Sequence, residues 1–301
     1  MPKQILITGA SGLVGSRLTQ LLIEQGHHVS HLSRSDKNGP IPTFVWDVEK
    51  KHVDEKAFNN IDTIIHLAGA GVADKRWNTK RKEEIKESRT HSTRLLYEKL
   101  KENKHEVKTF ICASAIGYYG FTLSDKVFTE DSEAGNDFLA QVVKAWEAEA
   151  DQISLLGIRV TKIRTGIVLS KKDGALEQMA LPVKLFIGSP LASGEQYISW
   201  IHIDDLCGIF IKAVNDEQVT GPYNGVAPQP VTNKAMTVGI ARVLKRPLWV
   251  PKVPAFILKL VVGEMADSVI NGSNVSSSKI ENAGYHFEFP DLDMALKDVL
   301  I

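Results

Sequence analysis

The chain has 301 residues, 43% of them hydrophobic, and its 36 basic residues (Lys and Arg) balance its 36 acidic residues (Asp and Glu). This hydrophobic content excludes a mainly disordered chain and is sufficient for one large domain or two interlocked ones. The zero net charge argues against a dedicated nucleic-acid binder, which usually carries a concentrated excess of basic residues.

The cysteines and the chain ends point to a cytoplasmic protein. Cys112 and Cys207 lie far apart and fit neither a disulfide framework nor metal-ligand spacing. The N-terminus lacks a secretion signal, and the apolar segment 253–263, interrupted by Lys259, is too short to span a membrane. We therefore expect a small-molecule substrate, no metal site, no nucleic-acid partner and no membrane partner; a homodimer is left open.

Short β-branched segments alternate with amphipathic ones through the first half of the chain. This alternation predicts a parallel sheet wrapped by helices, with right-handed crossovers. The stripe formed by Leu18, Leu21 and Leu22 is typical of a helix that packs on such a sheet. The expected strands are residues 5–7, 29–32, 44–46, 63–67, 109–113 and 160–163.

The first expected strand runs into a glycine-rich segment that opens an apolar helix. In a dinucleotide-binding turn the first glycine allows the tight turn, the second lets backbone approach the pyrophosphate and the third permits close helix–strand packing. The helix N-terminus then offers free N–H groups to the phosphates. The competing interpretation is a glycine-rich turn without a ligand. The expected cofactor-binding residues are Gly9, Ala10, Ser11, Gly12, Leu13, Val14 and Gly15, which follow Thr8.

The end of the second expected strand distinguishes NAD from NADP. An acid there would bind the adenosine ribose hydroxyl of NAD, whereas an arginine can neutralise the 2′-phosphate of NADP. The chain has Ser33 and Arg34 at this place, about 20 residues past the glycines. Although an arginine after a strand is often only a solvated charge, its position favours NADP(H).

After about residue 170 the alternation weakens, and prolines divide the chain into short pieces. Residues 221–226 have the pattern of a turn and a short strand that returns to the first sheet. We therefore predict a doubly wound α/β sheet with strand order 3-2-1-4-5-6, with its ligand cleft at the carboxyl ends of the strands. The expected division is a nucleotide-binding domain over 1–169, joined by 205–230, and a smaller substrate region over 170–204 and 231–301.

The glycine loop, Leu67-Ala68-Gly69 and the segment 200–206 resemble the extended short-chain dehydrogenase/reductases, which include nucleotide-sugar epimerases. The resemblance covers nearly the whole chain and implies a Rossmann fold. Other motifs look like an atypical branch, the epimerase-family proteins, whose own small C-terminal domain would be about residues 250–297 here. Those motifs are Arg76-Trp77-Asn78, Gly117-Tyr118-Tyr119-Gly120, Trp146-Glu147, 164–169 and 224–228.

This resemblance implies further cofactor contacts. It assigns the 2′-phosphate to Ser33 and Arg34 and the adenosine side to Leu67 and Ala68. The remaining residues placed like cofactor contacts of that branch are Glu84, Arg89 and Val168. Without the resemblance, Glu84 and Arg89 would be interpreted as part of a solvated helix face.

The catalytic residues that the resemblance implies are only partly present. Extended reductases use a Tyr-x-x-x-Lys pair together with a serine after the fifth strand, and Ser114 matches that serine. Residues 138–144, where the tyrosine is expected, contain none. The Tyr-x-x-x-Lys match from Tyr97 to Lys101 precedes the serine strand and is attributed to chance.

Tyr118 and Tyr119 are the nearest alternative hydroxyl donors. An unperturbed tyrosine titrates near 10, so either would need a neighbouring cation to act as a base at neutral pH, and Lys144 is a candidate. Alternatively, both tyrosines pack in a turn and cap the nucleotide. We take Ser114 and Tyr118 as the catalytic candidates.

Other polar residues are given structural interpretations. His66 and His202 are expected to be packed, hydrogen-bonded histidines, and Asp204 and Asp205 to be acids at a helix start. The predicted function is that of an NADP(H)-dependent oxidoreductase or epimerase-like protein acting on an unidentified hydroxyl or carbonyl compound, a nucleotide sugar being one option. The alternative is a non-catalytic NADP(H)-binding sensor or regulatory protein, which the missing tyrosine favours.

Overall fold

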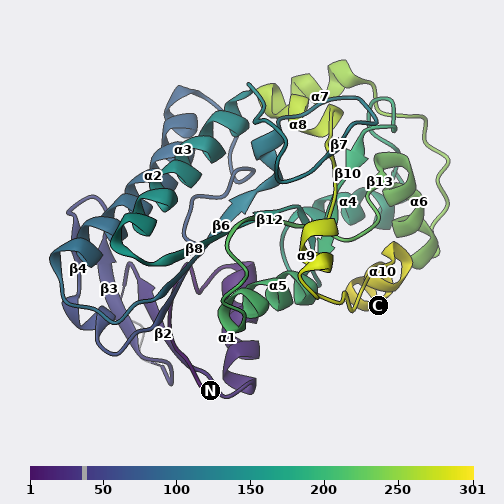
Figure 1. The fold of residues 1–301 in the computed structure, drawn as a ribbon. Helices are drawn as coiled ribbons and strands as arrows, with labels where there is room; N and C mark the ends of the chain where they lie inside the picture. Colours follow the sequence, from purple (N-terminus) through teal and green to yellow (C-terminus); the bar gives the residue numbers. More distant parts are fainter. Residues whose placement is uncertain (36–38) are drawn as a thin grey trace.

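The computed structural model describes residues 1–35 and 39–301, apart from the side chains of 261 and 262. An eight-stranded sheet forms its centre, in the order β12-β8-β6-β5-β1-β2-β3-β4 (Figure 1). All neighbours are parallel except β3 and β4. The strands are β1 (Gln4–Thr8), β2 (His28–Ser33), β3 (Thr43–Asp47), β4 (His52–Val53), β5 (Thr63–His66), β6 (Thr109–Ala115), β8 (Arg159–Thr165) and β12 (Gly221–Gly225).

This topology confirms the predicted doubly wound fold. The six expected strands correspond to β1, β2, β3, β5, β6 and β8, and they stand in the predicted order 3-2-1-4-5-6. The segment 221–226 returns to the sheet, because β12 pairs in parallel with β8. The carboxyl ends of the parallel strands therefore share one edge, where a ligand cleft is expected.

Helices cover both faces of the sheet. On one face, α1 (Leu13–Glu24) and α5 (Ile203–Asn215) pack together and bury side chains such as Leu22 with Ile7 of β1. On the other, α2 (Thr79–Glu102) and α3 (Phe138–Ile153) bury side chains such as Trp146 with Phe110 of β6. Both faces of these strands are covered, which accounts for their nearly continuous apolar sequences.

The C-terminal region has its own core, built from α4 (Ala175–Lys184), α6 (Asn233–Val243) and α10 (Leu292–Leu300). Three two-stranded sheets accompany it: β9 (Ile167–Leu169) with β11 (Trp200–His202), β10 (Tyr197–Ile198) with β13 (Val231–Thr232), and β7 (Val127–Phe128) with β14 (Asn274–Val275). The remaining helices are α7 (Ala255–Val262), α8 (Ala266–Ile270) and α9 (Ser278–Asn282), and the 3-10 turns are η1 (Glu55–Phe58), η2 (Ile116–Tyr119), η3 (Ser154–Leu156) and η4 (Gly263–Met265).

The start of α5 joins this region to the nucleotide-binding sheet. Asp204 accepts two hydrogen bonds from Arg17 of α1, at 2.6 and 2.9 Å. The buried Asp205 carboxylate accepts from the backbone N–H groups of Glu288 and Phe289 and from the hydroxyl of Tyr285. Both acids lie in the first turn of α5 as predicted, but their carboxylates also hold α1 and the C-terminal segment in place.

No helix in the described part of the chain is long and apolar enough to cross a membrane. The longest helix, α2, carries charged side chains along its length. The apolar segment 253–263, expected to be too short for a span, contains α7 and ends at Gly263, the first residue of η4.

Candidate dinucleotide-binding site

The glycine loop makes a turn that only glycine can complete. Gly9 has φ 69°, and a Cβ there would lie 2.8 Å from the backbone of Leu67. A Cβ on Gly15 would lie 2.4 Å from the carbonyl oxygen of Gly9, so α1 can approach β1 only with glycine at 15. Gly12 is the N-cap of α1 and no side chain caps this end. The first-turn N–H groups therefore face outward beside exposed Ser11, as an anion-binding helix start requires.

A buried hydrogen-bond network fixes the backbone around the loop. The Thr8 hydroxyl accepts from the N–H groups of Leu67 and Ala68, both at 3.2 Å, and also contacts His66 Nδ1 at 2.7 Å. Because both Thr8 lone pairs are used, its hydroxyl hydrogen is donated to Nδ1, and His66 carries its own hydrogen on Nε2. That nitrogen faces the hydroxyls of Ser92 and Thr93 on α2.

This network confirms that His66 is a packed, hydrogen-bonded histidine. Complete burial, with a smaller contribution from the positive charge of Arg89, lowers the pKa of His66 to about 3. His202 is also packed: its ring stacks on Phe289 with centroids 3.8 Å apart, and its Nδ1 accepts from the Asp204 N–H. Neither imidazole is an exposed base.

Ser33 and Arg34 lie where the sequence predicts a selector for the cofactor. Ser33 ends β2, beside β1 and its glycine loop, and Arg34 follows with an exposed side chain. Within the described residues Arg34 has no ion-pair partner. This places an exposed cation at the carboxyl edge of the sheet.

Arg89 and Glu84, both on α2, have different surroundings. The Arg89 side chain packs against Gly69 and over the Trp146 ring at 5.2 Å, and it donates to the Ile85 carbonyl at 2.9 Å. Burial, with repulsion from Arg81, lowers the pKa of Arg89 to about 10. It therefore lies at the turn that follows β5, where the resemblance places a cofactor contact.

Glu84 is exposed and pairs with Arg81 at 2.7 Å, and this hydrogen bond lowers its pKa. Val168 lies half-buried on β9, which pairs with β11 and is not a strand of the main sheet. For both residues, contact with a cofactor stays a prediction.

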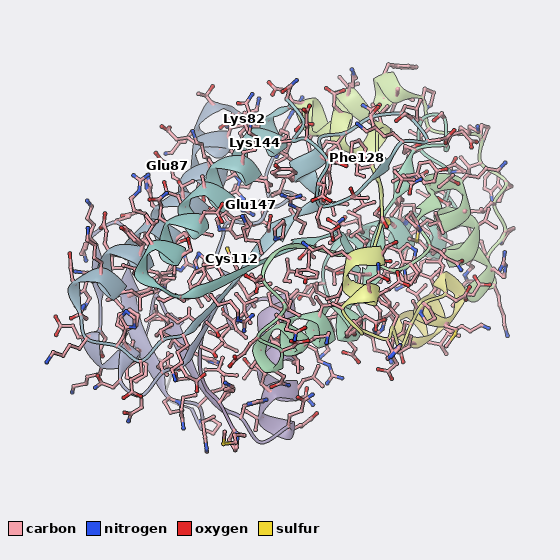
Figure 2. The ribbon with its side chains drawn as sticks, viewed as in Figure 1. Lys82, Glu87, Cys112, Phe128, Lys144 and Glu147 are labelled. Atoms are coloured by element: carbon pink, nitrogen blue, oxygen red, sulfur yellow. The ribbon has the colours of Figure 1, made fainter. Side chains whose placement is uncertain are left out.

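Ser114 belongs to a buried charged network. It is only 4% exposed, and its hydroxyl donates to Glu147 Oε1 at 2.6 Å. The same carboxylate pairs with Arg164 and lies 3.7 Å from the Lys162 amine. Figure 2 labels Glu147 on the side of α3 near Cys112, which shares β6 with Ser114. The hydroxyl hydrogen of Ser114 is therefore already donated to Glu147. Contact of Ser114 with a substrate stays a prediction.

The two tyrosines of η2 differ in their environments. Tyr119 is buried, and its hydroxyl donates to Asn224 at 2.6 Å and accepts from Arg164 at 3.0 Å. Burial, partly offset by Arg164, raises the pKa of Tyr119 to about 12. Tyr119 thus packs in the turn, as the structural alternative supposes. Tyr118 is only half-buried, so its hydroxyl remains the better catalytic candidate.

The cation that lies against the Tyr118 ring is Arg164, which the sequence pattern did not single out. The guanidinium of Arg164 lies 3.5 Å from the centre of the Tyr118 ring, whereas Lys144 is exposed on α3. Parallel pairing of β8 with β6 places Arg164 next to Ser114 and the turn after it. A contact of Lys144 with Tyr118 stays a prediction. The alternation of charged and apolar residues in β8 was the sequence signal for this network.

An aromatic ring stands at the start of α3, where the missing tyrosine was sought. Phe138 packs edge-on against Trp77 with ring centroids 5.1 Å apart, and the Lys82 amine lies 5.3 Å from its ring. Phe138 offers no hydroxyl. In the described part of the chain, no group of three or more His, Cys, Asp or Glu side chains is arranged to hold a metal ion.

Comparison with known proteins gives a consistent pattern. Residues 5–224 match the model of the NAD dependent epimerase/dehydratase family, and 253–299 match a domain of unknown function, DUF1731. The chain is 38% identical to epimerase family protein YfhF of Bacillus subtilis over 98% of this chain and 97% of the relative. It is 37% identical to epimerase family protein SAR0825 of Staphylococcus aureus, covering 99% of each chain.

Two solved structures are similar at appreciable identity. Human epimerase family protein SDR39U1, solved with NADPH, has a TM-score of 0.89 and 32% identity, covering 98% of each chain. The nucleoside-diphosphate sugar epimerase from Corynebacterium glutamicum has a TM-score of 0.82 and 34% identity, covering all of this chain and 58% of the other. UDP-glucose 4-epimerase from Thermotoga maritima, at 16% identity and a TM-score of 0.79, shares the fold.

Proposed function

The chain belongs to the NAD-dependent epimerase/dehydratase family, and on that premise we propose that it binds NADP(H) and transfers hydride to or from a small-molecule substrate. The substrate would present a hydroxyl or carbonyl carbon, and nucleotide sugars are one class to test. The cofactor would supply the hydride chemistry, while this chain binds and orients the two reactants.

The observation that carries the proposal is the backbone cradle at Gly9, Gly12 and Gly15. The two close approaches at Gly9 and Gly15 leave no room for a Cβ, and the uncapped start of α1 offers N–H groups for a pyrophosphate. Ala10, Ser11, Leu13 and Val14 complete this loop as proposed cofactor contacts. A turn built only for packing would not need its helix start to be uncapped and open.

The preference for NADP(H) is supported by the cation at the end of β2. Arg34 is exposed and has no ion-pair partner within the described chain, so its guanidinium is free to meet a 2′-phosphate. Arg89 adds a half-buried cation against Gly69, the residue after Leu67 and Ala68. NADPH in the human relative agrees with this preference, although other structures of the same fold contain NAD.

Ser114 and Tyr118 are the proposed substrate-facing residues, at the ends of β6 and in η2. Because Ser114 donates its hydrogen to Glu147, its oxygen would accept a hydrogen bond from a substrate hydroxyl. Tyr118 would exchange the proton with the substrate oxygen as hydride moves. The region over 170–204 and 231–301 would close the cleft above them.

The proposed cellular setting is the cytoplasm. Cys112 and Cys207 are free and buried, which supports a reducing, cytoplasmic compartment. The balanced charge supports a small-molecule substrate over a nucleic acid. A homodimer remains a prediction to be checked by the mass of the protein in solution.

The test has a binding arm and a turnover arm. Fluorescence titration should give tighter binding of NADPH than of NADH, and equal affinities would contradict the cofactor preference. With NADPH bound, carbonyl compounds and nucleotide sugars are then followed by the absorbance of reduced nicotinamide and by isotope exchange at sugar carbons. Tyr118→Phe should abolish turnover while leaving NADPH affinity unchanged.

A second candidate function is a non-catalytic NADP(H)-binding sensor or regulatory protein. The observation that favours it is Phe138 at the start of α3, together with the engaged hydroxyl of Tyr119. This alternative predicts full occupancy by NADPH with no turnover of any substrate. Turnover that depends on Tyr118 would exclude it.

A further inference from the structure

An exposed apolar surface lies on the C-terminal region, where α7 forms the upper edge of the molecule in Figure 1. We name it the α7 face and define it as residues 184–187, 245–252 and 256–260. Its largest exposed side chains are Trp249, Phe256 and Leu260, which are 69%, 70% and 76% exposed. Phe256 and Leu260 are one helical turn apart, so they project from the same side of α7.

Contacts within the chain hold residues 245–252 of the α7 face next to residues 184–187. Val253 forms a β-bridge with Leu191, and the Ser189 hydroxyl donates to the Pro251 carbonyl at 2.6 Å. The Arg246 guanidinium lies 4.4 Å over the Phe186 ring. Residues 245–252 thus lie beside 184–187, and residues 256–260 follow in the chain after Pro254; apolar exposure of this kind commonly marks an interaction site.

The charges on the α7 face have one sign. Residues 244–260 contain four basic residues and no acidic residue, although the whole chain is neutral. Lys259 has Asp267 as a partner at 3.1 Å, and Lys252 donates to a backbone carbonyl. Within the described residues, Lys245 and Arg246 have no carboxylate partner. Exposed aromatic and aliphatic side chains are thus mixed with unneutralised cations.

We propose that the α7 face docks the protein on an anionic lipid surface. Tryptophan and phenylalanine partition into the interfacial layer of a bilayer, while neighbouring lysine and arginine heads reach the lipid phosphates. Each cation near an anionic bilayer contributes about a fivefold increase in partitioning. The expectation of no membrane partner rested on the length needed to span a bilayer, which surface docking does not require.

The charge pattern favours lipid over a second copy of the chain. Two copies joined through the α7 face would bring the cations of both faces together, and like charges across an interface oppose association. An acidic protein would also complement the positive charge of the α7 face, so the experiment includes binding to an acidic polypeptide as one outcome.

The full-length protein is mixed with vesicles of phosphatidylcholine alone or of phosphatidylcholine and phosphatidylglycerol in equal amounts. We expect flotation with the anionic vesicles only, and release at high salt because the charge attraction is screened. Trp249 is an exposed reporter, and its fluorescence should shift to shorter wavelength and be quenched by brominated acyl chains. Flotation no stronger than that of an unrelated neutral protein would overturn the proposal.

Paired variants test the apolar and basic parts separately. Phe256→Glu/Leu260→Glu should lower vesicle binding at least tenfold, whereas Leu155→Glu, at a site of 72% exposure on η3, should not. Lys245→Glu/Arg246→Glu should also lower vesicle binding at least tenfold. Lys101→Glu/Lys104→Glu changes the net charge by the same amount and should leave vesicle binding unchanged. All variants should retain NADPH affinity, which separates this test from that of the proposed function.

Three further results would also overturn the proposal. The first is an α7-face variant that binds vesicles like the unmodified protein. The second is a dimer that does not bind vesicles and that the Phe256→Glu/Leu260→Glu substitutions dissociate. The third is binding to poly-glutamate with no binding to anionic vesicles.

Discussion

Glu147 and Arg164 form a buried ion pair with two parallel hydrogen bonds, Nε to Oε1 at 2.8 Å and Nη2 to Oε2 at 2.9 Å. The pair joins α3 to β8, and through Ser114 it also reaches β6. Arg164 lies over Tyr118 and donates to the hydroxyl of Tyr119. The orientation of both tyrosines therefore depends on a carboxylate from another element.

Removing only the carboxylate should be strongly destabilising. Glu147→Leu leaves the Arg164 guanidinium buried without its counter-charge, and we expect the free energy of unfolding to fall by about 3–5 kcal/mol in denaturant titrations. The double variant Glu147→Leu/Arg164→Leu should lose less than the sum of the two single variants. Additive losses would mean that the two side chains are not coupled.

The same carboxylate should contribute to acid unfolding. Burial opposes ionisation of Glu147, but the hydrogen bonds and charge of Arg164 outweigh it and lower the pKa of Glu147. Its stabilisation is thus complete above the unfolded-state pKa of about 4.5 and is lost as pH falls through the lower folded-state pKa. Stability measured against pH should decline less steeply below pH 5 in the double variant than in the unmodified protein.

His66 should add a separate pH dependence at higher pH. Its pKa is about 3 in the folded chain and near 6.5 when exposed, so only the unfolded chain takes up this proton between those values. The contribution of His66 to the free energy of unfolding is fully present above pH 6.5. It should fall by up to about 1.4 kcal/mol per pH unit as the pH decreases towards 3. His66→Gln should remove this slope between pH 6.5 and 4, and the exposed His286→Gln should retain it.

Arg34 should affect NADPH and NADH differently. A lost charge-assisted contact to a phosphate corresponds to a decrease in affinity of about 10- to 100-fold, so Arg34→Ser should weaken NADPH binding by this factor. NADH has no 2′-phosphate, and its affinity should stay within about twofold. Lys104→Ser, at an exposed site that precedes the amino end of β6 and so lies away from the carboxyl edge of the sheet, is the control. Equal losses for both cofactors would assign Arg34 a structural role.

Gly15→Ala should damage the nucleotide loop by steric conflict. Its Cβ would lie 2.4 Å from the Gly9 carbonyl oxygen, so α1 must move away from β1 and the cradle must open. We expect NADPH affinity to fall at least about tenfold, with a loss of stability of about 1–3 kcal/mol. Gly26→Ala is a matched control, because its φ of 83° is strained although no atom lies within 4 Å of the new Cβ. It should lower stability only.

The nucleotide-binding half was predictable because its signals are local. The central strands β1 and β5 are short apolar segments, the glycine turn follows β1 directly, and Arg34 follows β2 at the expected distance. Parallel pairing then brings these strand ends to one edge, so neighbouring site residues could be inferred from strand order alone. The return of β12 was also visible, as a glycine turn before a short strand.

The catalytic surroundings were less predictable, because they depend on contacts between distant elements. Lys144 is closer in sequence to Tyr118 than Arg164 is, yet Arg164 is the cation at the ring. The roles of Glu147 and Asp205 likewise depend on partners from other elements. No helical or strand period encodes such partners.

Sequence pattern alone thus identified the sheet, its strand order and the nucleotide loop, since hydrophobic period and glycine placement act over a few residues. Only the folded chain paired Arg164 with Glu147, directed the Ser114 hydroxyl into that pair and brought residues 184–187 beside residues 245–252. These features depend on which charges are buried together and on which apolar side chains remain exposed to solvent. Both are set by how the helices and the sheet pack.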